Sequence, residues 1–203
     1  MSNKFDTFCE ELTQAKEELK LTQETVKTLS EENELLKKEI LDLQQYTRRD
    51  NLLVFGVPDC PDESVYQLID KVSHTIGGMQ FVQDISVAHR LPTKPGKPKP
   101  IVIRFNKRTS RDSWFQRFKE EARKDGDGPG LSLQRIFPQL PAGRVTAGEH
   151  LTIATRSLFN STRDAAKQKE YQFVWTKDCK VFIRKNERSP ALKINSLHDL
   201  INL

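Results

Sequence analysis

The stretch FDTFCEELTQAKEELKLTQETVKTLSEENELLKKEILDL, from Phe5 to Leu43, repeats every seven residues and contains neither Pro nor Gly. Two positions of the repeat, a and d, are mainly apolar, which is the signature of a coiled coil. Position a holds Phe5, Leu12, Leu19, Val26, Asn33 and Ile40, and position d holds Phe8, Ala15, Thr22, Leu29, Leu36 and Leu43. A single helix cannot bury such a stripe, so residues 1–49 are predicted to form a coiled coil between copies of the chain. A helix that docks on its own chain is the alternative.

Residues at and beside this stripe favour a parallel arrangement of the helices. In a parallel pair in register, Glu32 at position g faces Lys37 at position e of the partner. Asn33 at position a either sets the register of such a pair or is a tolerated polar residue of the seam. Ala15 and Thr22 weaken the seam, so the sequence leaves both a homodimer and a homotrimer open.

Charge is distributed unevenly along the chain. The net charge is −4 over residues 1–50, +3 over residues 51–130 and +6 over residues 131–203. A basic region behind an acidic helix indicates a polyanionic partner. Nucleic acid is favoured over a membrane, because the sequence contains no basic amphipathic helix and no run of ~18 apolar residues.

The cysteines and the N-terminus predict an intracellular protein. Cys9, Cys60 and Cys179 are far apart and form no CxxC motif, so they are expected to be reduced thiols. The first residues, MSNKFDTFCE, lack the apolar segment of a secretion signal. We expect a cytoplasmic protein of ribonucleoprotein particles, with the nucleus as the alternative.

Residues 50–137 show the order strand, helix, strand, strand, helix, strand. The expected elements are a strand from Asn51 to Pro58, a helix with Val65 and Ile76 on one face, a strand from Phe81 to Leu91, a strand from Ile101 to Phe105, a helix capped by Ser110, and a closing strand from Leu131 to Phe137. This βαββαβ order is that of RNA-recognition motifs. The segment Asp125–Gly130 is expected to be a flexible turn.

Residues 138–203 are predicted to be a small α/β domain, which makes the whole chain α+β. Its expected elements are an opening segment from Gly143 to Leu151, a helix from about Thr152 to Lys169, a hairpin of Tyr171–Thr176 with Lys180–Lys185, a strand from Ala191 to Ile194, and a short closing helix capped by Asn195 or Ser196.

Several groups of basic residues are candidates for contacts with a nucleic-acid backbone. The candidates are Arg48 and Arg49 at the end of the coiled coil, Lys94, Lys97 and Lys99 in a Pro-rich loop, Arg104, Lys107, Arg108 and Arg111 at the third strand, Arg156, Arg163 and Lys167 on one side of the last long helix, and Lys180, Arg184 and Lys185 in the hairpin. The alternatives are solvated loops and helix faces, and for Arg48 and Arg49 a favourable interaction with the helix dipole.

Aromatic residues for base stacking are few. The aromatic ribonucleoprotein motif is absent from the third strand, which offers only Phe105, and Phe55 in the first strand favours a core position. In the hairpin, Trp175 and Phe182 stand among basic residues, a combination that suits single strands, with a core role for Trp175 as the alternative. Recognition is therefore expected to depend on backbone charge.

No pattern of catalysis or metal binding is present in the sequence. His74, His89, His150 and His198 are scattered without ligand spacing, and no nucleophile motif or pair of catalytic carboxylates appears. We expect neither an enzyme nor a metal or cofactor site.

Three stretches carry a resemblance to a known family: YTRRDNLLVFGVP, KPIVIRFNKRTSRDSW, and GEHLTIATRSLFNSTRDAAKQKEYQFVWTKDCKVFIRKNE. Together they resemble the first open-reading-frame protein of LINE-type non-LTR retrotransposons, and the last is similar to the C-terminal domain of baculoviral few-polyhedra (FP) proteins. The resemblance implies an oligomeric RNA-binding protein and nucleic-acid chaperone that packages its transcript. Some insect relatives carry a zinc module, for which this chain has no Cys/His cluster.

Two functions follow from these observations. The first is a homo-oligomeric protein that binds single-stranded RNA, or DNA, in a retrotransposon ribonucleoprotein. The alternative is a viral or host scaffolding protein of the few-polyhedra type, which acts through protein contacts in virion or occlusion-body assembly. A steep loss of affinity with salt is expected only for the first.

Overall fold

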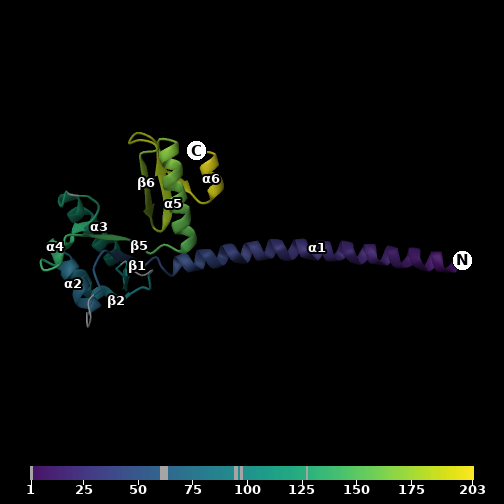
Figure 1. Ribbon diagram of the computed structural model, residues 1–203, viewed down its shortest axis with the longest axis horizontal. Coiled ribbons are helices and arrows are strands. Elements are labelled where there is room, and N and C mark those ends of the chain that lie inside the picture. Colours follow the sequence, from purple (N-terminus) through teal and green to yellow (C-terminus); the bar gives the residue numbers. More distant parts are fainter. Residues whose placement is uncertain (1, 60–63, 94–95, 97, 127) are drawn as a thin grey trace. The chain divides into compact units, whose positions relative to one another are not determined.

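The fold is α+β, with a long N-terminal helix followed by two antiparallel sheets (Figure 1). A computed structural model of the chain describes residues 2–59, 64–93, 96, 98–126 and 128–203.

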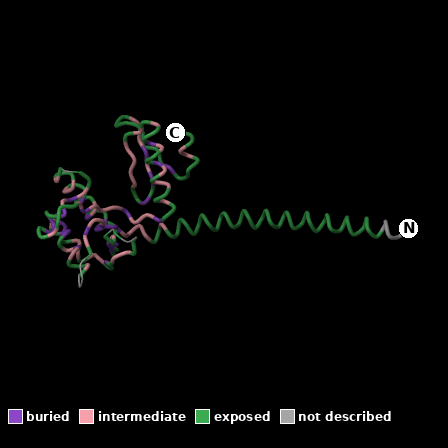
Figure 2. Tube along the Cα trace, viewed as in Figure 1, coloured by how far each residue is buried: buried purple, intermediate pink, exposed green. Residues whose placement is uncertain are grey.

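The long helix α1 forms most of the first of two compact units, residues 1–44 and 45–203. It runs from Ser2 to Tyr46 without interruption, as the heptad stretch predicts. From residue 7 on, nearly every residue of α1 is exposed in the single chain (Figure 2), and Leu29 and Leu36 keep 58% and 56% of their surface in water. No described helix combines the length with the apolar character that crossing a bilayer requires.

The second unit begins with a five-stranded sheet of order β2-β3-β1-β5-β4, in which each strand is antiparallel to its neighbours. The elements of this part are β1 Asn51–Phe55, α2 Val65–Thr75, the 3-10 helix η1 Met79–Asp84, β2 Ile85–Arg90, β3 Ile101–Phe105, α3 Arg108–Lys124, β4 Leu131–Ser132, α4 Leu133–Ile136 and β5 Arg144–Glu149. The predicted strand at residues 101–105 and the predicted helix after residue 65 are confirmed.

The core of this part lies between the sheet and the helices α2 and α3. Leu52 in β1 and Ile103 in β3 are fully buried against Trp114 of α3. The Trp114 indole N–H donates a 2.8 Å hydrogen bond to the Ser73 hydroxyl of α2, so that the buried donor is satisfied and the two helices are joined.

The predicted closing strand at residues 131–137 was wrong. Only Leu131 and Ser132 pair as β4, and the chain then turns into α4, because Leu133, Ile136 and Phe137 have helical spacing and are buried together. The strand that pairs with β1 is instead β5, whose residues Glu149 to Thr146 meet Leu52 to Phe55 of β1.

Two glycines allow the chain to cross β5 closely. A Cβ atom on Gly56 would lie 2.0 Å from the Arg144 carbonyl oxygen, and one on Gly130 would lie 2.1 Å from the Val145 carbonyl oxygen. Both glycines also have φ of +87°, which side-chain-bearing residues rarely adopt.

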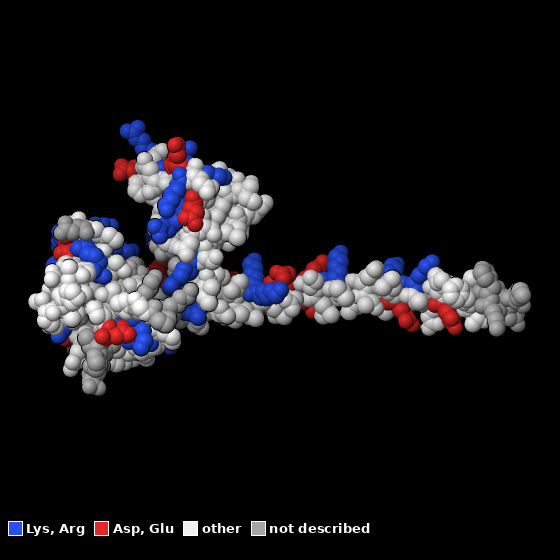
Figure 3. Space-filling model, in the orientation of Figure 1, with Lys and Arg blue, Asp and Glu red and all other residues white. Residues whose placement is uncertain are grey.

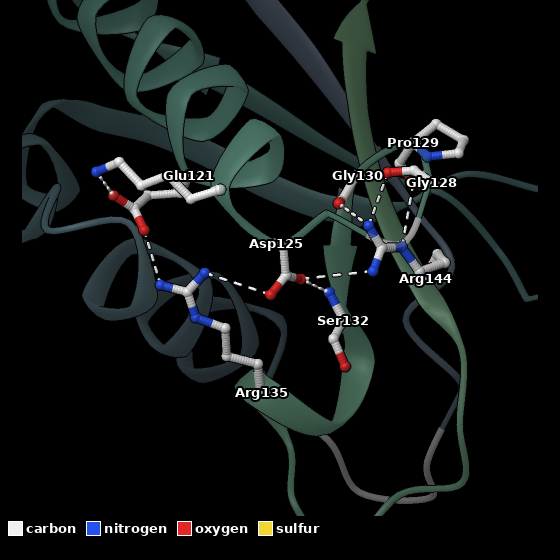
Figure 4. A network of polar contacts seen from close by, with 9 residues as sticks. Glu121, Asp125, Gly128, Pro129, Gly130, Ser132, Arg135 and Arg144 are labelled. Atoms are coloured by element: carbon white, nitrogen blue, oxygen red, sulfur yellow. Dashed lines mark hydrogen bonds and ion pairs between the residues drawn. The ribbon is translucent and has the colours of Figure 1, made fainter.

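The segment expected to be a flexible turn is held by an ion-pair network (Figure 4). The Arg144 guanidinium donates hydrogen bonds to the carbonyls of residues 128, 129 and 130 and lies 3.5 Å from the Asp125 carboxylate. Asp125 also accepts from the backbone N–H of Ser132, and Arg135 bridges Asp125 to Glu121. These contacts anchor both ends of the described turn.

The last part is a two-layer unit in which a three-stranded sheet, β6-β7-β8, packs against α5. Its elements are α5 Ile153–Gln168, β6 Phe173–Lys177, β7 Lys180–Arg184, β8 Leu192–Ile194 and α6 Leu197–Ile201. The core joins Ala166 of α5 to Val181, Ile183 and Ile194 of the sheet. The predicted helix, hairpin, strand and closing helix are confirmed, and Ser196 caps α6 through a capping box with Asp199.

Candidate nucleic-acid interface

Most basic candidates of the first sheet already have carboxylate partners. The Lys107 ammonium lies 3.1 Å from Asp84, and the Arg108 guanidinium lies 3.2 Å from Asp50. The positive charges at the start of α3 are therefore largely balanced within the chain. Arg104 is exposed in β3, opposite Asn51 of β1.

Arg111 is buried, which corrects its placement in this surface group. Only 4% of its side chain is exposed, and its guanidinium donates to Glu149 at 3.0 Å and to Asp112 at 2.6 Å. Burial alone would lower the pKa of Arg111, but the hydrogen bonds to Asp112 and Glu149 raise it above its usual value. Arg111 shares its helix face with Trp114 and Phe118, so helical spacing directs it inward. It is not available to a phosphate.

The Pro-rich loop is only partly described, since Lys94 and Lys97 lie outside the described residues. The Lys99 ammonium lies 3.7 Å from Asp59, and its backbone N–H donates to the same carboxylate at 3.0 Å. Arg90, which sequence reasoning missed, holds this loop in place: its guanidinium donates to the carbonyls of Lys99, Val57 and Pro58. Its position at the end of β2 was the available signal.

The helix α5 presents an exposed basic side, as predicted. Thr152 caps the helix by accepting from the backbone N–H of Thr155, while Thr162 and Ala166 face the sheet. We call the outward group the helix surface; its members are Arg156, Arg163 and Lys167. Figure 3 shows basic side chains gathered in the region of α5. None of the three has a carboxylate partner among the described residues.

The opposite side of this two-layer unit is the outer face of the sheet. Residues that are paired across antiparallel strands lie on the same face of the sheet. The pair of Val174 and Ile183 faces α5. The alternate pairs therefore face outward: Phe173 with Arg184, Trp175 with Phe182, and Lys177 with Lys180. Lys193 of β8, opposite Phe182, joins them. We call the basic members the sheet surface: Lys177, Lys180, Arg184 and Lys193.

The ten cations of residues 152–203 differ from Lys99, Lys107 and Arg108 beside the first sheet in having no ion partner among the described residues. This segment carries ten basic and five acidic side chains, and no described residue forms an ion pair with any of the ten. Lys169 instead donates to the carbonyls of Leu200, Ile201 and Leu203, and the Lys185 ammonium lies 6.0 Å from the Tyr171 ring centroid. Eight of the ten cations are exposed, while Lys169 and Arg184 are half-buried.

The candidate aromatic residues divide into core and surface. Phe105 is 2% exposed and packs on Trp114, so it offers no ring to a base. Phe55 is half-buried outside the main core cluster. Trp175 is half-buried on the outer face of its sheet and stacks on Phe182, with ring centroids 5.7 Å apart and planes inclined by 16°.

The hairpin turn is tied to the first sheet by Glu149. This buried carboxylate accepts from the Arg111 guanidinium through Oε1 and from the Cys179 backbone N–H through Oε2, at 3.0 and 3.1 Å. Asp178 and Cys179 have φ of 52° and 59°, an uncommon conformation for residues other than glycine. Burial raises the pKa of the Cys179 thiol to about 12, so the thiol is unreactive at neutral pH.

A second junction, missed by sequence reasoning, joins the end of α1 to the start of α5. The Gln45 amide donates to the His150 carbonyl at 3.1 Å and accepts from the Thr152 backbone N–H at 2.9 Å. The His150 ring lies 3.1 Å from the Asn51 amide nitrogen. Arg49, a candidate residue, lies over the Tyr46 ring at 5.5 Å.

The positive charge near this junction affects the pKa of His150. Burial, and then the positive charges of Arg48, Arg156 and His89, lower its pKa from 6.5 to about 4. Two candidate residues that lie far apart in the sequence, Arg48 and Arg156, thus act on one imidazole. Their spacing in the sequence does not predict that Arg48 and Arg156 lie near the same residue.

Stability is expected to fall as the pH drops from about 6.5 towards about 4. In this range the unfolded state protonates His150 while the folded state keeps it neutral, so the unfolded state binds more protons and is favoured by acid. Urea unfolding of the wild type and of His150→Gln across this range will measure the effect. The variant should lose this part of the pH dependence; equal pH dependence in both proteins would contradict the assignment.

A family model matches the last part of the chain. Residues 152–203, which hold α5, the three-stranded sheet and α6, match the family described as baculovirus FP protein domain 2. None of the curated proteins compared with the chain matches it. The family match coincides with the segment whose cations have no described ion partner.

Proposed function

We propose that this chain is a homo-oligomeric protein that binds single-stranded nucleic acid through residues 152–203, with RNA as the favoured partner over DNA. The observation that carries the proposal is the contrast in ion pairing. Three candidate cations beside the first sheet, Lys99, Lys107 and Arg108, are balanced by Asp59, Asp84 and Asp50, whereas the ten cations of the last segment have no ion partner among the described residues. A polyanion that binds there gains charge neutralisation without first breaking ion pairs.

The helix surface and the sheet surface lie on opposite sides of the same two-layer unit. Two strands held on one unit would be close enough to exchange partners, which supports a role as a nucleic-acid chaperone. The proposal places the protein in cytoplasmic ribonucleoprotein particles, as in a retrotransposon, and involves no catalytic step.

The proposal also assigns the other two parts of the chain. The exposed apolar stripe of α1 supports a parallel coiled coil, which would bring several binding units together and raise avidity through effective concentration. The strand order β2-β3-β1-β5 and the helices α2 and α3 support an RNA-recognition-motif-like domain. Because Phe105 is in its core, this domain would contribute through charge, with Arg104 as an exposed cation of its sheet.

Neutralising the helix surface is expected to weaken nucleic-acid binding. The variant Arg156→Gln/Arg163→Gln/Lys167→Gln should bind with lower affinity, and its salt slope (log affinity against log salt) should fall by roughly 0.7 for each phosphate that is no longer neutralised. Fluorescence anisotropy with a labelled single strand at several salt concentrations measures both. Surface changes of this kind usually alter stability by less than about 0.5 kcal/mol.

The matched control is Lys107→Gln/Arg108→Gln, which removes cations that already have carboxylate partners. Its loss of affinity should be smaller than that of the helix-surface variant. Equal losses in the two variants would contradict the contrast in ion pairing, and an unchanged salt slope in the first variant would remove the helix surface from the interface.

A scaffolding protein of the few-polyhedra type is the second candidate function. The match of residues 152–203 to the baculovirus FP family favours it. In that case the basic surfaces would contact acidic proteins in virion or occlusion-body assembly. A chain that binds no single strand at low salt, where electrostatic attraction to phosphates is strongest, would favour the scaffold.

A further inference from the structure

Beside the outer edge of β6 lies a groove of 410 Å³, which is within the size range of small-molecule sites. It is lined by Gln172, Phe173, Val174, Trp175, Arg184 and Ala191. Every one of these residues belongs to the part of the chain whose cations have no described ion partner.

Flat groups dominate the surface of this groove. The Arg184 guanidinium carbon lies 4.8 Å from the centroid of the Phe173 ring, and the Trp175 indole stacks on Phe182. None of these rings belongs to the core between the sheet and α5. Planar surfaces of this kind attract other planar π systems, because offset stacking on aromatic rings and guanidinium planes is favourable.

Arg184 also has an unused hydrogen-bond donor. Its Nε is shielded from water and has no hydrogen-bond partner in the described chain. The Nη groups of the same guanidinium are not shielded and have no described hydrogen-bond partner either, so an acceptor atom of a ligand in the groove can reach them. Nucleobase edges carry such acceptors, whereas an aliphatic side chain does not.

We propose that this groove is a base-binding site, in which an unpaired nucleobase stacks on Trp175 beside the Phe173–Arg184 pair. This site rests on the proposed function, and it adds to that function which part of the nucleic acid is contacted, namely the base. Lys177, Lys180 and Lys193, on the same face of the sheet, take the flanking phosphates. Every base has a π face, so the site is tolerant of sequence but requires an unpaired base, and a duplex is excluded from it.

Tryptophan fluorescence gives a direct test, because the chain has only two tryptophans. Trp114 is fully buried against Phe118, so quenching by a bound base reports on Trp175. The full-length protein is titrated with a single-stranded RNA, with DNA of the same sequence, with an abasic strand of equal length, and with a duplex. The two base-containing single strands should quench the fluorescence, while the abasic strand and the duplex should not.

Variants separate stacking from charge. Trp175→Ala should weaken binding of the base-containing strand by roughly 5- to 150-fold, the usual range for one stacked base, and leave abasic binding unchanged. Trp175→Phe should retain most of the affinity. Arg184→Lys keeps the charge but removes the guanidinium plane and its Nη donors, so it should weaken only base-containing strands. The emission of Trp114 in each Trp175 variant checks the fold of the first sheet, and circular dichroism checks the rest.

Equal affinity for base-containing and abasic strands, with no quenching, would overturn the base-binding site and leave the proposed function standing. The same holds if Trp175→Ala and Arg184→Lys, both folded, bind the base-containing strand as the wild type does. A protein that binds none of the strands would overturn the proposed function and this site together.

Discussion

Glu149→Ala is expected to lower the free energy of unfolding by about 3–5 kcal/mol, the usual cost of removing one partner of a buried ion pair. The side chains of Glu149 and Arg111 are 2% and 4% exposed. Without the carboxylate, the Arg111 guanidinium loses one of its two ion partners, and its Nε already has no hydrogen-bond partner. The Cys179 backbone N–H loses its acceptor as well. Urea unfolding at a fixed protomer concentration measures the loss.

Three further variants separate charge from hydrogen bonding. Glu149→Gln keeps one acceptor oxygen and should destabilise less than Glu149→Ala. The double variant Arg111→Met/Glu149→Leu removes both charges and should recover part of the loss, although the unpaired Cys179 N–H still costs about 1–3 kcal/mol. Lys107→Ala, which breaks an ion pair whose lysine is 67% exposed, should cost less than about 1 kcal/mol. A Glu149→Ala protein as stable as Lys107→Ala would contradict this role.

The consequence of losing Glu149 should extend beyond stability. Its two carboxylate oxygens connect α3 and β5 of the first sheet to the turn between β6 and β7. Most of the sheet surface is carried by those two strands, so the hairpin that presents Trp175 is positioned by a contact outside its own sheet. Folded Glu149→Gln protein is therefore a test of whether binding depends on this connection.

Elements whose residues follow one clear period were predictable from sequence. The heptads predicted the extent of α1, and Thr152 followed by helical spacing predicted the start of α5. The exposed basic side of α5 followed from the same periodicity. In each case, local spacing alone determines which residues share a face.

Features that depend on the pairing of distant segments were not predictable in this way. The segment from Gly143 to Leu151 was expected to open the last domain, and nothing local shows that its residues 144–149 form a strand that pairs with β1 of the first sheet. Helical spacing places Arg111 on the face of Trp114 and Phe118, but no local pattern shows that its charge is balanced there by Glu149, which lies 38 positions further along the chain. The junction of Gln45 with His150 spans 105 positions and has no local pattern.

Replacing Leu29 and Leu36 with Gln is expected to convert the proposed homo-oligomer into monomers without unfolding the second unit. Both side chains lie at position d and are exposed in the single chain, so their burial is the expected gain from helix pairing. Sedimentation at several protein concentrations measures the change. Substitution is a cleaner test than truncation before Asn51, because truncation would also remove Gln45, which holds His150 and Thr152.

The chain offers a matched control on the same helix. Leu21 and Leu35 are 66% and 59% exposed, close to the values of Leu29 and Leu36, but they lie outside positions a and d. Leu21→Gln/Leu35→Gln should therefore leave the oligomer intact. If both double variants dissociate equally, general hydrophobicity and not the heptad seam causes association.

Asn33→Ile is expected to stabilise the helices and to mix their stoichiometry. An apolar residue at this position a removes the polar group that penalises other arrangements of the helices. Thermal unfolding measures the stability, and sedimentation measures the number of chains in the assembly. A variant with unchanged stoichiometry and unchanged thermal stability would show that Asn33 does not set the arrangement.

The affinity for a long single strand is expected to depend on the oligomeric state, because an oligomer can engage such a strand with several units at once. A monomeric Leu29→Gln/Leu36→Gln protein would retain the proposed contacts of residues 152–203 with a strand, but a long single strand could no longer engage several units at once. Its affinity for a long strand should fall steeply, while its affinity for a strand that fits one unit stays unchanged. Anisotropy titrations with labelled strands of both lengths measure the two affinities. Equal affinity of monomer and oligomer for a long strand would reduce α1 to a purely architectural element.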